Sequence, residues 1–151
     1  MSSSEKINVK IKKLRDSARI PEYKTSGSAA CDLCAAIDAP VVIAPGEVSL
    51  IPTGISVEPE NDGIAILIFA RSGLAVKHGI CPANAVGVVD SDYRGEIMVG
   101  LRNSSAISYE ILPGERIAQM MFVPIYTAAF IPTDSLSDTE RSAGGFGHTG
   151  R

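Results

Sequence analysis

The 151-residue chain contains 14 Gly and 9 Pro, and 45% of its residues are hydrophobic. Its 14 Lys and Arg against 17 Asp and Glu give a net charge of −3, which argues against direct nucleic-acid binding or attachment to an anionic membrane, because both favour basic surfaces. No apolar run approaches the roughly 18 residues of a membrane-spanning helix, and the N-terminus lacks the apolar core of a signal peptide.

Most of the chain shows the two-residue periodicity of β-strands. Ile7, Val9 and Ile11 alternate with polar residues, which is typical of a strand with one solvated face. Turn residues separate further strands, which are expected in chain order at 31–37, 41–44, 48–51, 55–58, 64–70, 86–89, 96–101, 107–111, 116–123 and 128–131. This pattern predicts one all-β domain, a distorted β-barrel or jelly roll of many short strands with one short helix.

The composition changes near Thr133. From there to the end the only large apolar residues are Leu136 and Phe146, and glycines accumulate. Such a segment buries too little apolar surface to offset the entropy lost on ordering. We therefore predict a β-domain over residues 1–132 and a flexible C-terminal arm over residues 133–151.

Three cysteines, an odd number, indicate a reducing compartment rather than a disulfide framework. We therefore expect a cytoplasmic protein, with the nucleus as an alternative in a eukaryotic cell. Cys31 and Cys34 form a C-x-x-C pair, but a zinc site needs two further ligands nearby. We interpret the pair as two small buried residues.

The loops between the strands carry the residues suited to chemistry. Asp32 lies among small apolar residues, so its carboxylate needs a partner or a hydrated cleft, unless it only shapes a turn. A short helix is expected at 72–78, with Ser72 as its N-cap and Gly79 as its end. Arg71 and the free N–H groups of that helix would suit phosphate oxygens, and an ordinary turn is the alternative.

Another apolar strand leads into Asp90, Asp92 and Tyr93, where a hairpin turn is expected. A carboxylate at a strand end is a candidate general base. Aspartates also shape turns, which explains Asp92 better than Asp90. On a later strand, Gln119 either donates to a phosphate oxygen or is solvated.

The last segment, residues 141–150, is rich in glycine. Glycines let the backbone approach a phosphate closely, and Arg, Ser, His and Thr side chains supply donors. Phe146 has no core to join there, so it is either incidental or stacks on a planar ligand. Together these segments supply what a nucleoside triphosphate needs: phosphate donors, a stacking aromatic ring, a polar pocket and a carboxylate for water.

In this order and spacing, the five segments resemble the five motifs of the homotrimeric dUTP diphosphatase (dUTPase) family. The resemblance covers nearly the whole chain, and its most specific parts are residues 71–74, 87–96 and 144–147. It implies hydrolysis of dUTP to dUMP and pyrophosphate with Mg²⁺, which supplies dUMP for thymidylate synthesis and keeps uracil out of DNA. It also implies a homotrimer with shared active sites, each closed by the arm of a neighbouring subunit.

The resemblance further implies roles for individual residues. Asp90 would activate a water for in-line attack on the α-phosphorus, and Asp32 would hold the water shell of a Mg²⁺ bound by the phosphates. Tyr93 would pack under the deoxyribose, and Phe146 would stack over uracil. The residues implied to hold the phosphates are Arg71, Ser72, Gly73 and Gln119, with Arg141, Gly147, His148 and Thr149 from the arm. Those implied to meet uracil are Asn84, Gly87, Val88, Val89, Asp90 and the backbone of Met98.

Two positions depart from the family pattern. Ala30-Cys31 stands where relatives often have Gly-Tyr or Gly-Leu, and His148 stands where many have Ser, which keeps a donor but alters its pH dependence. A dCTP deaminase-type or bifunctional relative is an alternative on the same fold, but no residue is placed as its acid/base beside cytosine C4. A non-catalytic regulatory protein is a second alternative, and the presence of Asp90 and Tyr93 argues against it.

Overall fold

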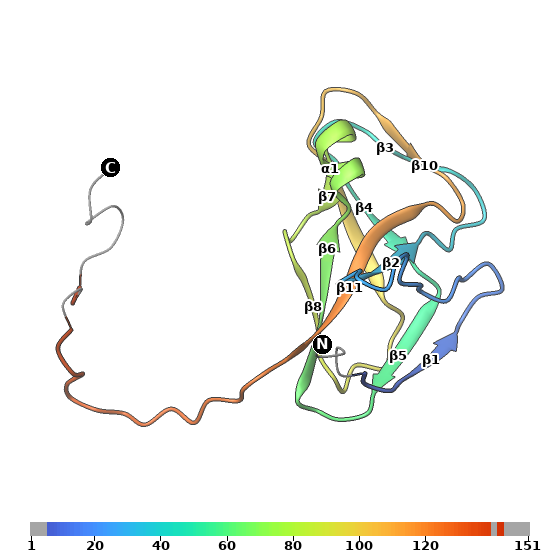
Figure 1. Ribbon diagram of the computed structural model, residues 1–151. Helices are drawn as coiled ribbons and strands as arrows, with labels where there is room; N and C mark the ends of the chain where they lie inside the picture. The colour runs from blue at the N-terminus through green and yellow to red at the C-terminus, as the bar shows by residue number, and fades with distance from the viewer. Residues whose placement is uncertain (1–5, 140–141, 144–151) are drawn as a thin grey trace.

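The computed structural model describes residues 6–139, 142 and 143, which form eleven strands and one helix (Figure 1). The helix is α1 (Ser72–His78). The strands are β1 (Val9–Lys13), β2 (Cys31–Cys34), β3 (Val41–Ile43), β4 (Val48–Pro52), β5 (Ile55–Pro59), β6 (Ile64–Ala70), β7 (Ile80–Pro82), β8 (Gly87–Val89), β9 (Met98–Asn103), β10 (Tyr109–Ile111) and β11 (Arg116–Pro124). The predicted all-β class with one short helix is confirmed.

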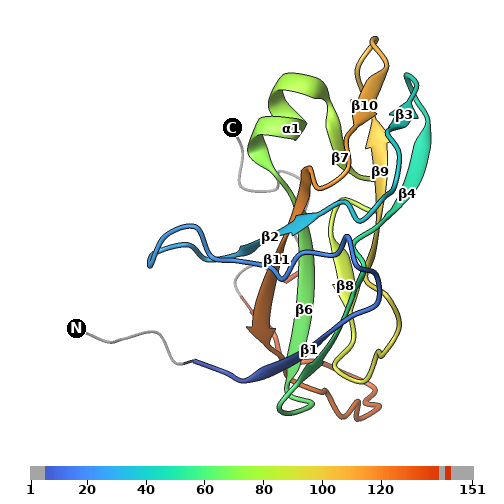
Figure 2. The ribbon, with the colours of Figure 1, turned by 90° about the vertical axis from the view of Figure 1, so that its right-hand side faces the viewer.

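All strand pairs are antiparallel and form four ladders, ordered β1-β5, β3-β10, β2-β11-β6-β8 and β4-β9-β7. Figures 1 and 2 show β6 and β11 side by side through the molecule, with α1 near one end and the β1-β5 pair near the other. Over the described residues no sheet closes into a barrel, so of the two predicted architectures the jelly roll is the one that fits.

The core between the ladders is filled mainly by isoleucine. Ile43 and Ile66 have no exposed surface, and β-branched side chains of this kind pack well on the pleated surface of extended strands. The alternation along β2 sends Cys31 and Leu33 into this core and leaves Asp32 on the opposite face. The core therefore determines which face of β2 carries the carboxylate.

Helix α1 occupies the predicted residues, but its N-cap is Arg71 and not Ser72. The Arg71 backbone is extended, its carbonyl accepts the N–H of Ala75 at 2.9 Å, and no side chain caps the helix. Ser72 already has helical geometry and is the first residue of the helix. Gly79 ends the helix in the left-handed conformation, at a φ of 68°, as the sequence predicts.

The strand predicted at 128–131 is wrong. The last strand, β11, ends with Pro124, and the chain then leads away from the body of the molecule (Figure 1). Phe130 and Ile131 are 93% and 85% exposed. An apolar run without a neighbouring strand leaves its backbone unpaired and does not form a stable strand.

The three-residue strand β7 is not predicted by the sequence pattern. It ends in Pro82 and is too short for a periodicity to be recognised, yet it pairs with β9 along its length. In the part of the predicted arm that the structure describes, residues 133–139 are exposed and contain no helix or strand. The only helix of the described residues is far too short to cross a membrane.

Candidate functional site

The β2-β11-β6-β8 ladder brings distant segments of the sequence together. Strand β11 pairs with β2 so that Gln119 lies opposite Asp32, and with β6 so that Gln119 lies opposite Phe69. Arg71 and α1 follow immediately after β6. Directly paired residues of antiparallel strands share a face, so Asp32 and Gln119 lie on one face near Arg71.

A β-bulge in β11 adds a second arginine to this face. The register between β2 and β11 shifts between Arg116 and Ala118, and a bulge inserts one residue that breaks the strict alternation of side chains. Ile117 and Ala118 are both buried, whereas Arg116 is exposed and Gln119 is half-buried. Arg116 and Gln119 therefore face the same side, although three positions separate them.

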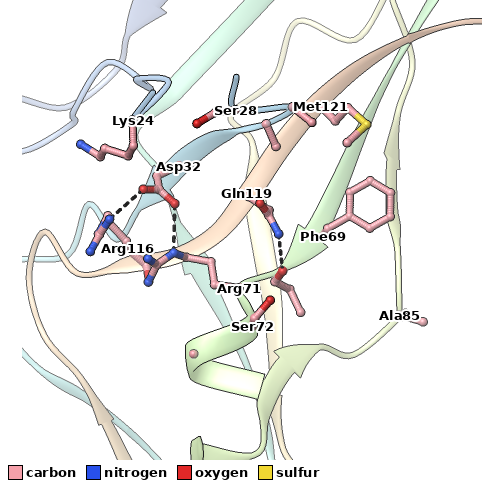
Figure 3. A pocket seen from close by; sticks show the side chains of 14 residues that line it. Lys24, Ser28, Asp32, Phe69, Arg71, Ser72, Ala85, Arg116, Gln119 and Met121 are labelled. Carbon is pink, nitrogen blue, oxygen red and sulfur yellow. Dashed lines mark hydrogen bonds and ion pairs between the residues drawn. The ribbon is translucent and has the colours of Figure 1, made fainter. Parts of the chain in front are cut away.

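Asp32 pairs with two arginines (Figure 3). Arg71 Nε donates to Oδ1 at 2.9 Å, and Arg116 Nη1 donates to Oδ2 at 3.0 Å. Arg71 Nη1 also donates to the carbonyl oxygen of Arg116 at 3.1 Å. The Asp32 side chain is only 14% exposed, so without these partners its charge would be costly. The predicted need for a partner is confirmed, and we call these three residues the Asp32 cluster.

The Asp32 cluster lines a surface cavity of about 710 Å³ (Figure 3). Ser72 and Gly73 at the start of α1 line it too, as does Gln119, whose Nε2 donates to the carbonyl of Ala70 at 2.8 Å. A Cβ at Gly73 would have no neighbouring atom within 4 Å, so this glycine leaves open space. Guanidinium, hydroxyl and amide groups around one cavity suit a chain of phosphates.

Part of this cavity is not predicted by the sequence. Lys24 and Ser28 come from the loop between β1 and β2, which carries no recognisable motif. Phe69 and Met121 supply apolar wall. The one sequence signal that could have placed Arg116 in the site is its position three residues before Gln119. Strict strand alternation, however, predicts that these two side chains lie on opposite faces.

The residues predicted to meet a base and a sugar form a second group, which runs from the turn before β8 through the following loop to the start of β9. Strand β8 pairs with β6, with Gly87 opposite Ile68. A Cβ at Gly87 would lie 3.0 Å from the Cβ of Ile68, so glycine permits this close approach. The exposed members of the group are Asn84, Val88, Asp90, Tyr93 and Met98, and Gly87 and Val89 are half-buried.

Within one chain Asp90 does not reach the Asp32 cluster. Val89, next to Asp90, pairs with Ile66, whereas the Asp32 cluster lies beyond Ala70, at the other end of β6. At a rise of about 3.3 Å per residue, Asp90 lies about 20 Å along the strand from Arg71. Among the described residues that line the cavity, only Ala85 comes from the part of the chain that carries the second group, next to Asn84.

The loop after β8 is held by its own hydrogen bonds. The N–H of Tyr93 donates to the carbonyl of Asp90 at 3.1 Å, and the Tyr93 hydroxyl donates to the carbonyl of Glu96 at 3.1 Å. The Glu96 carboxylate accepts hydrogen bonds from Arg15, which lower the pKa of Glu96 below its usual range. These bonds fix the loop residues relative to one another. The hairpin turn predicted here is wrong: β8 pairs with β6, whereas β9 pairs with β4 and β7, so residues 90–97 form a loop between two sheets, which we call the Asp90 loop.

Asp32 is the one carboxylate among the described residues of the cavity. Each of its oxygens accepts one guanidinium N–H and keeps a lone pair, so the carboxylate can also accept a hydrogen bond from a metal-bound water. In residues 6–139, 142 and 143, no three His, Cys, Asp or Glu side chains are grouped to hold a metal. Cys31 is buried and Cys34 half-buried, both are free, and burial raises the pKa of each thiol. Their interpretation as small packing residues holds for Cys31 and in part for Cys34.

The residues predicted for the C-terminal arm, Arg141, Phe146, Gly147, His148 and Thr149, lie outside the described residues.

Comparisons with known proteins point in one direction. A family model described as dUTPase matches residues 16–150. The chain is 48% identical over 149 residues to the deoxyuridine 5′-triphosphate nucleotidohydrolase of Sodalis glossinidius (strain morsitans), covering 97% of this chain and 99% of that protein. It is likewise 48% identical to the protein of that name from Enterobacter sp. (strain 638), covering 97% and 98%. The dUTPase of Staphylococcus bacteriophage 80alpha, solved with dUPNHPP, superposes with a TM-score of 0.87 at 27% identity, covering 95% of this chain and 99% of that chain.

Proposed function

The chain belongs to the dUTPase family, and from this membership we propose that it hydrolyses dUTP to dUMP and pyrophosphate. The reaction would supply dUMP for thymidylate synthesis and keep uracil out of DNA. The observation in the structure that best supports the proposal is the cavity lined by the Asp32 cluster, Ser72, Gly73 and Gln119. Its fixed guanidinium groups and neutral donors match a triphosphate.

The triphosphate binds along this cavity in the proposed complex. Ser72, Gly73 and Gln119 contact α- and β-phosphate oxygens, and Arg71 adds positive charge. Asp32 keeps the Arg71 guanidinium in a fixed orientation through its 2.9 Å bond. A donor that is already oriented loses little conformational entropy when the phosphate arrives.

Asp90 accepts a proton from the attacking water. The water oxygen bonds to the α-phosphorus in line with the bridging oxygen, whose bond to that phosphorus breaks, and pyrophosphate leaves. An exposed carboxylate just after β8 is accessible to such a water. It must come close to a triphosphate held on another subunit, because Arg71 of its own chain is about 20 Å away along β6.

The residues in and around the Asp90 loop select the base and sugar. Asn84 and the backbone of residues 87–90 hydrogen-bond to the uracil edge, and the backbone of Met98 contacts the ring. A tight pocket rejects the thymine methyl by volume and cytosine by mismatched donors and acceptors. Tyr93 packs under the deoxyribose and leaves no room for a 2′-OH.

Bound Mg²⁺ would neutralise the charge of the phosphates and fix their geometry. Its ligands would come mainly from the phosphates and not from protein side chains. Asp32 would contact one of its waters through the lone pairs that the arginines leave free. The other residues proposed for the phosphate site would bind phosphate oxygens and not the metal.

The active sites are shared within a homotrimer in this proposal. One subunit supplies the Asp32 cluster and another supplies the Asp90 loop. The arm, residues 133–151, closes the site, with Arg141, His148 and Thr149 on the γ-phosphate and Phe146 over uracil. Free cysteines fit a reducing compartment, so we place this trimer in the cytoplasm.

Subunit complementation tests the shared site. Asp90→Asn and Arg71→Ala trimers are each expected to be inactive, and light scattering verifies that both remain trimers. After subunit exchange, a mixture should regain activity, because some sites then combine an intact cavity with an intact Asp90 loop. A mixture that exchanges subunits but stays inactive would show that each site belongs to one chain.

The reaction itself is tested by pyrophosphate release from dUTP, dTTP, dCTP and UTP in the presence of Mg²⁺. Rapid release from dUTP alone is the expected result. Ammonia released from dCTP would indicate the deaminase-type alternative. Binding of dUTP without pyrophosphate release would indicate a non-catalytic protein on the same fold.

A further inference from the structure

The loop that carries Tyr93 returns to the body of the protein through Glu96. The Tyr93 hydroxyl donates to the backbone carbonyl of Glu96 at 3.1 Å. The Tyr93 ring lies over Gly95 so closely that a Cβ at this position would collide with the phenol. The orientation of the Tyr93 ring therefore depends on where Glu96 is held.

Glu96 is held by a residue from the opposite end of the chain. Arg15, in the segment after β1, donates from Nε to Oε1 at 3.0 Å and from Nη2 to Oε2 at 3.2 Å. The N–H of Gly54, in the turn between β4 and β5, donates to Oε1 at 2.8 Å. The Glu96 side chain is only 18% exposed, and bidentate, charge-assisted bonds are among the strongest and most directional in proteins.

The Arg15 segment is itself anchored. The N–H of Leu14, next to Arg15, donates to the carbonyl of Gly54 at 2.7 Å. On the other side of the loop, the Ser56 hydroxyl donates to the carbonyl of Arg94 at 2.8 Å. Arg15 thus connects a fixed turn to the carboxylate of Glu96, and the backbone carbonyl of Glu96 in turn holds the Tyr93 hydroxyl.

We propose that Arg15 is a positioning residue for Tyr93 and thereby sets the discrimination between deoxyribose and ribose triphosphates. The inference rests on the proposed function, in which Tyr93 packs under the sugar. Without the bidentate bond, the Glu96 side chain keeps only the Gly54 N–H. Its carbonyl is then held through the following peptide, where the N–H of Ile97 donates to the carbonyl of Ile55 at 2.9 Å, and it can pivot about this bond together with the Tyr93 hydroxyl. A small displacement of the ring opens the space that excludes the 2′-OH and loosens the contact with deoxyribose.

The experiment compares kcat and KM for dUTP and UTP in Arg15→Gln, Arg15→Lys and a matched control. The control is Lys10→Gln, which removes the exposed 3.0 Å ion pair between Lys10 and Glu58 on the neighbouring β1-β5 ladder. Thermal unfolding of each variant verifies that it is folded at the assay temperature.

In Arg15→Gln we expect the dUTP-over-UTP ratio of kcat/KM to fall by about tenfold or more, since a misplacement of about 1 Å can cost up to 100-fold. The KM for dUTP should rise more than kcat falls, because Tyr93 contacts the sugar and not the reacting phosphorus. The ratio for Arg15→Lys should lie between those of the parent and Arg15→Gln, since an ammonium keeps the charge but cannot form the bidentate pair. Lys10→Gln should match the parent protein.

An unchanged ratio in folded Arg15→Gln overturns the inference, even if stability falls, because a purely structural role does not alter discrimination. If Arg15→Gln fails to fold, Glu96→Gln replaces it: its amide oxygen still accepts the Gly54 N–H but forms no ion pair. An unchanged ratio in Glu96→Gln then overturns the inference. A parent protein that releases no pyrophosphate from dUTP contradicts the proposed function, and this inference with it, whereas an active parent with an unaltered variant ratio contradicts the inference alone.

Discussion

The guanidinium of Arg116 donates to the carboxylate of Asp32 at 3.0 Å, although the two residues lie 84 positions apart in the chain. The contact exists because the bulge in β11 turns Arg116 toward the face on which β2 presents Asp32. Asp32 therefore binds Arg116 and Arg71 at once. The positive charge of the cavity is concentrated where a phosphate chain would lie.

Loss of Arg116 should weaken substrate binding more than folding. We expect Arg116→Gln to raise the KM for dUTP about tenfold, the cost of losing one charge-assisted contact to phosphate. Because the Arg116 side chain is 47% exposed, the free energy of unfolding should fall by less than about 1 kcal/mol. Steady-state kinetics and urea unfolding measure both effects, with Lys12→Gln on the exposed strand β1 as the control. A large loss of stability with an unchanged KM would contradict this prediction.

Asp90→Asn should separate binding from chemistry. The amide preserves the size of the side chain but does not accept the proton of the attacking water. We expect turnover of dUTP to fall by about 10³-fold, within the range for a lost general base, while the Kd for dUTP from calorimetry changes little. Hydrolysis near the parental rate would assign the base to another residue.

Gly73→Ala should leave stability intact while lowering activity. The added methyl meets no atom in the ligand-free cavity, and alanine favours the helix by about 0.5–1 kcal/mol over glycine. The same methyl occupies space proposed for phosphate oxygens, so kcat/KM for dUTP should fall about 10- to 100-fold. Gly27→Ala is the matched control, since Gly27 also faces open space but is not among the residues that line the cavity. Parental kinetics in Gly73→Ala would exclude a close approach of phosphate at this position.

The stability of the protein should depend on Tyr109 at alkaline pH. Burial and the 2.7 Å hydrogen bond to Glu115 raise the pKa of Tyr109 from 10.0 to about 12. Because the folded-state pKa is the higher one, the contribution of Tyr109 is complete below pH 10 and is lost as the pH rises toward 12. The advantage of the parent over Tyr109→Phe, about 1 kcal/mol at neutral pH for one hydrogen bond, should shrink over that range. Urea unfolding at a series of pH values measures it, and a constant difference would contradict the prediction.

The strand pattern is largely predictable from the sequence because most strands bury one face. In β2 and β6 the apolar residues enter the core, so their spacing in the sequence reports their environment. Phe130 and Ile131 show the limit of this argument. Their side chains are as apolar as those of the core, but nothing in the local sequence states whether a partner strand is present.

For the site, residue types are predictable and their partners are not. A carboxylate among small apolar residues indicates that Asp32 needs a counter-charge, yet local sequence does not select Arg71 and Arg116 among the arginines of the chain. Arg116 reaches Asp32 only through the β11 bulge, which is a property of the β2-β11 register. Arg15 is still less accessible to sequence reasoning, because its contact with Glu96 spans 81 residues and follows from the arrangement of the ladders.

Strand β6 carries Arg71 just beyond one end and holds β8, with Asp90, near the other. In a trimer with shared sites, these two ends would serve different catalytic centres. A sliding or tilting of this single strand would then disturb phosphate capture in one centre and water activation in the next. The three centres would be mechanically linked in a ring, and damage to β6 in one subunit would lower the output of two sites rather than one.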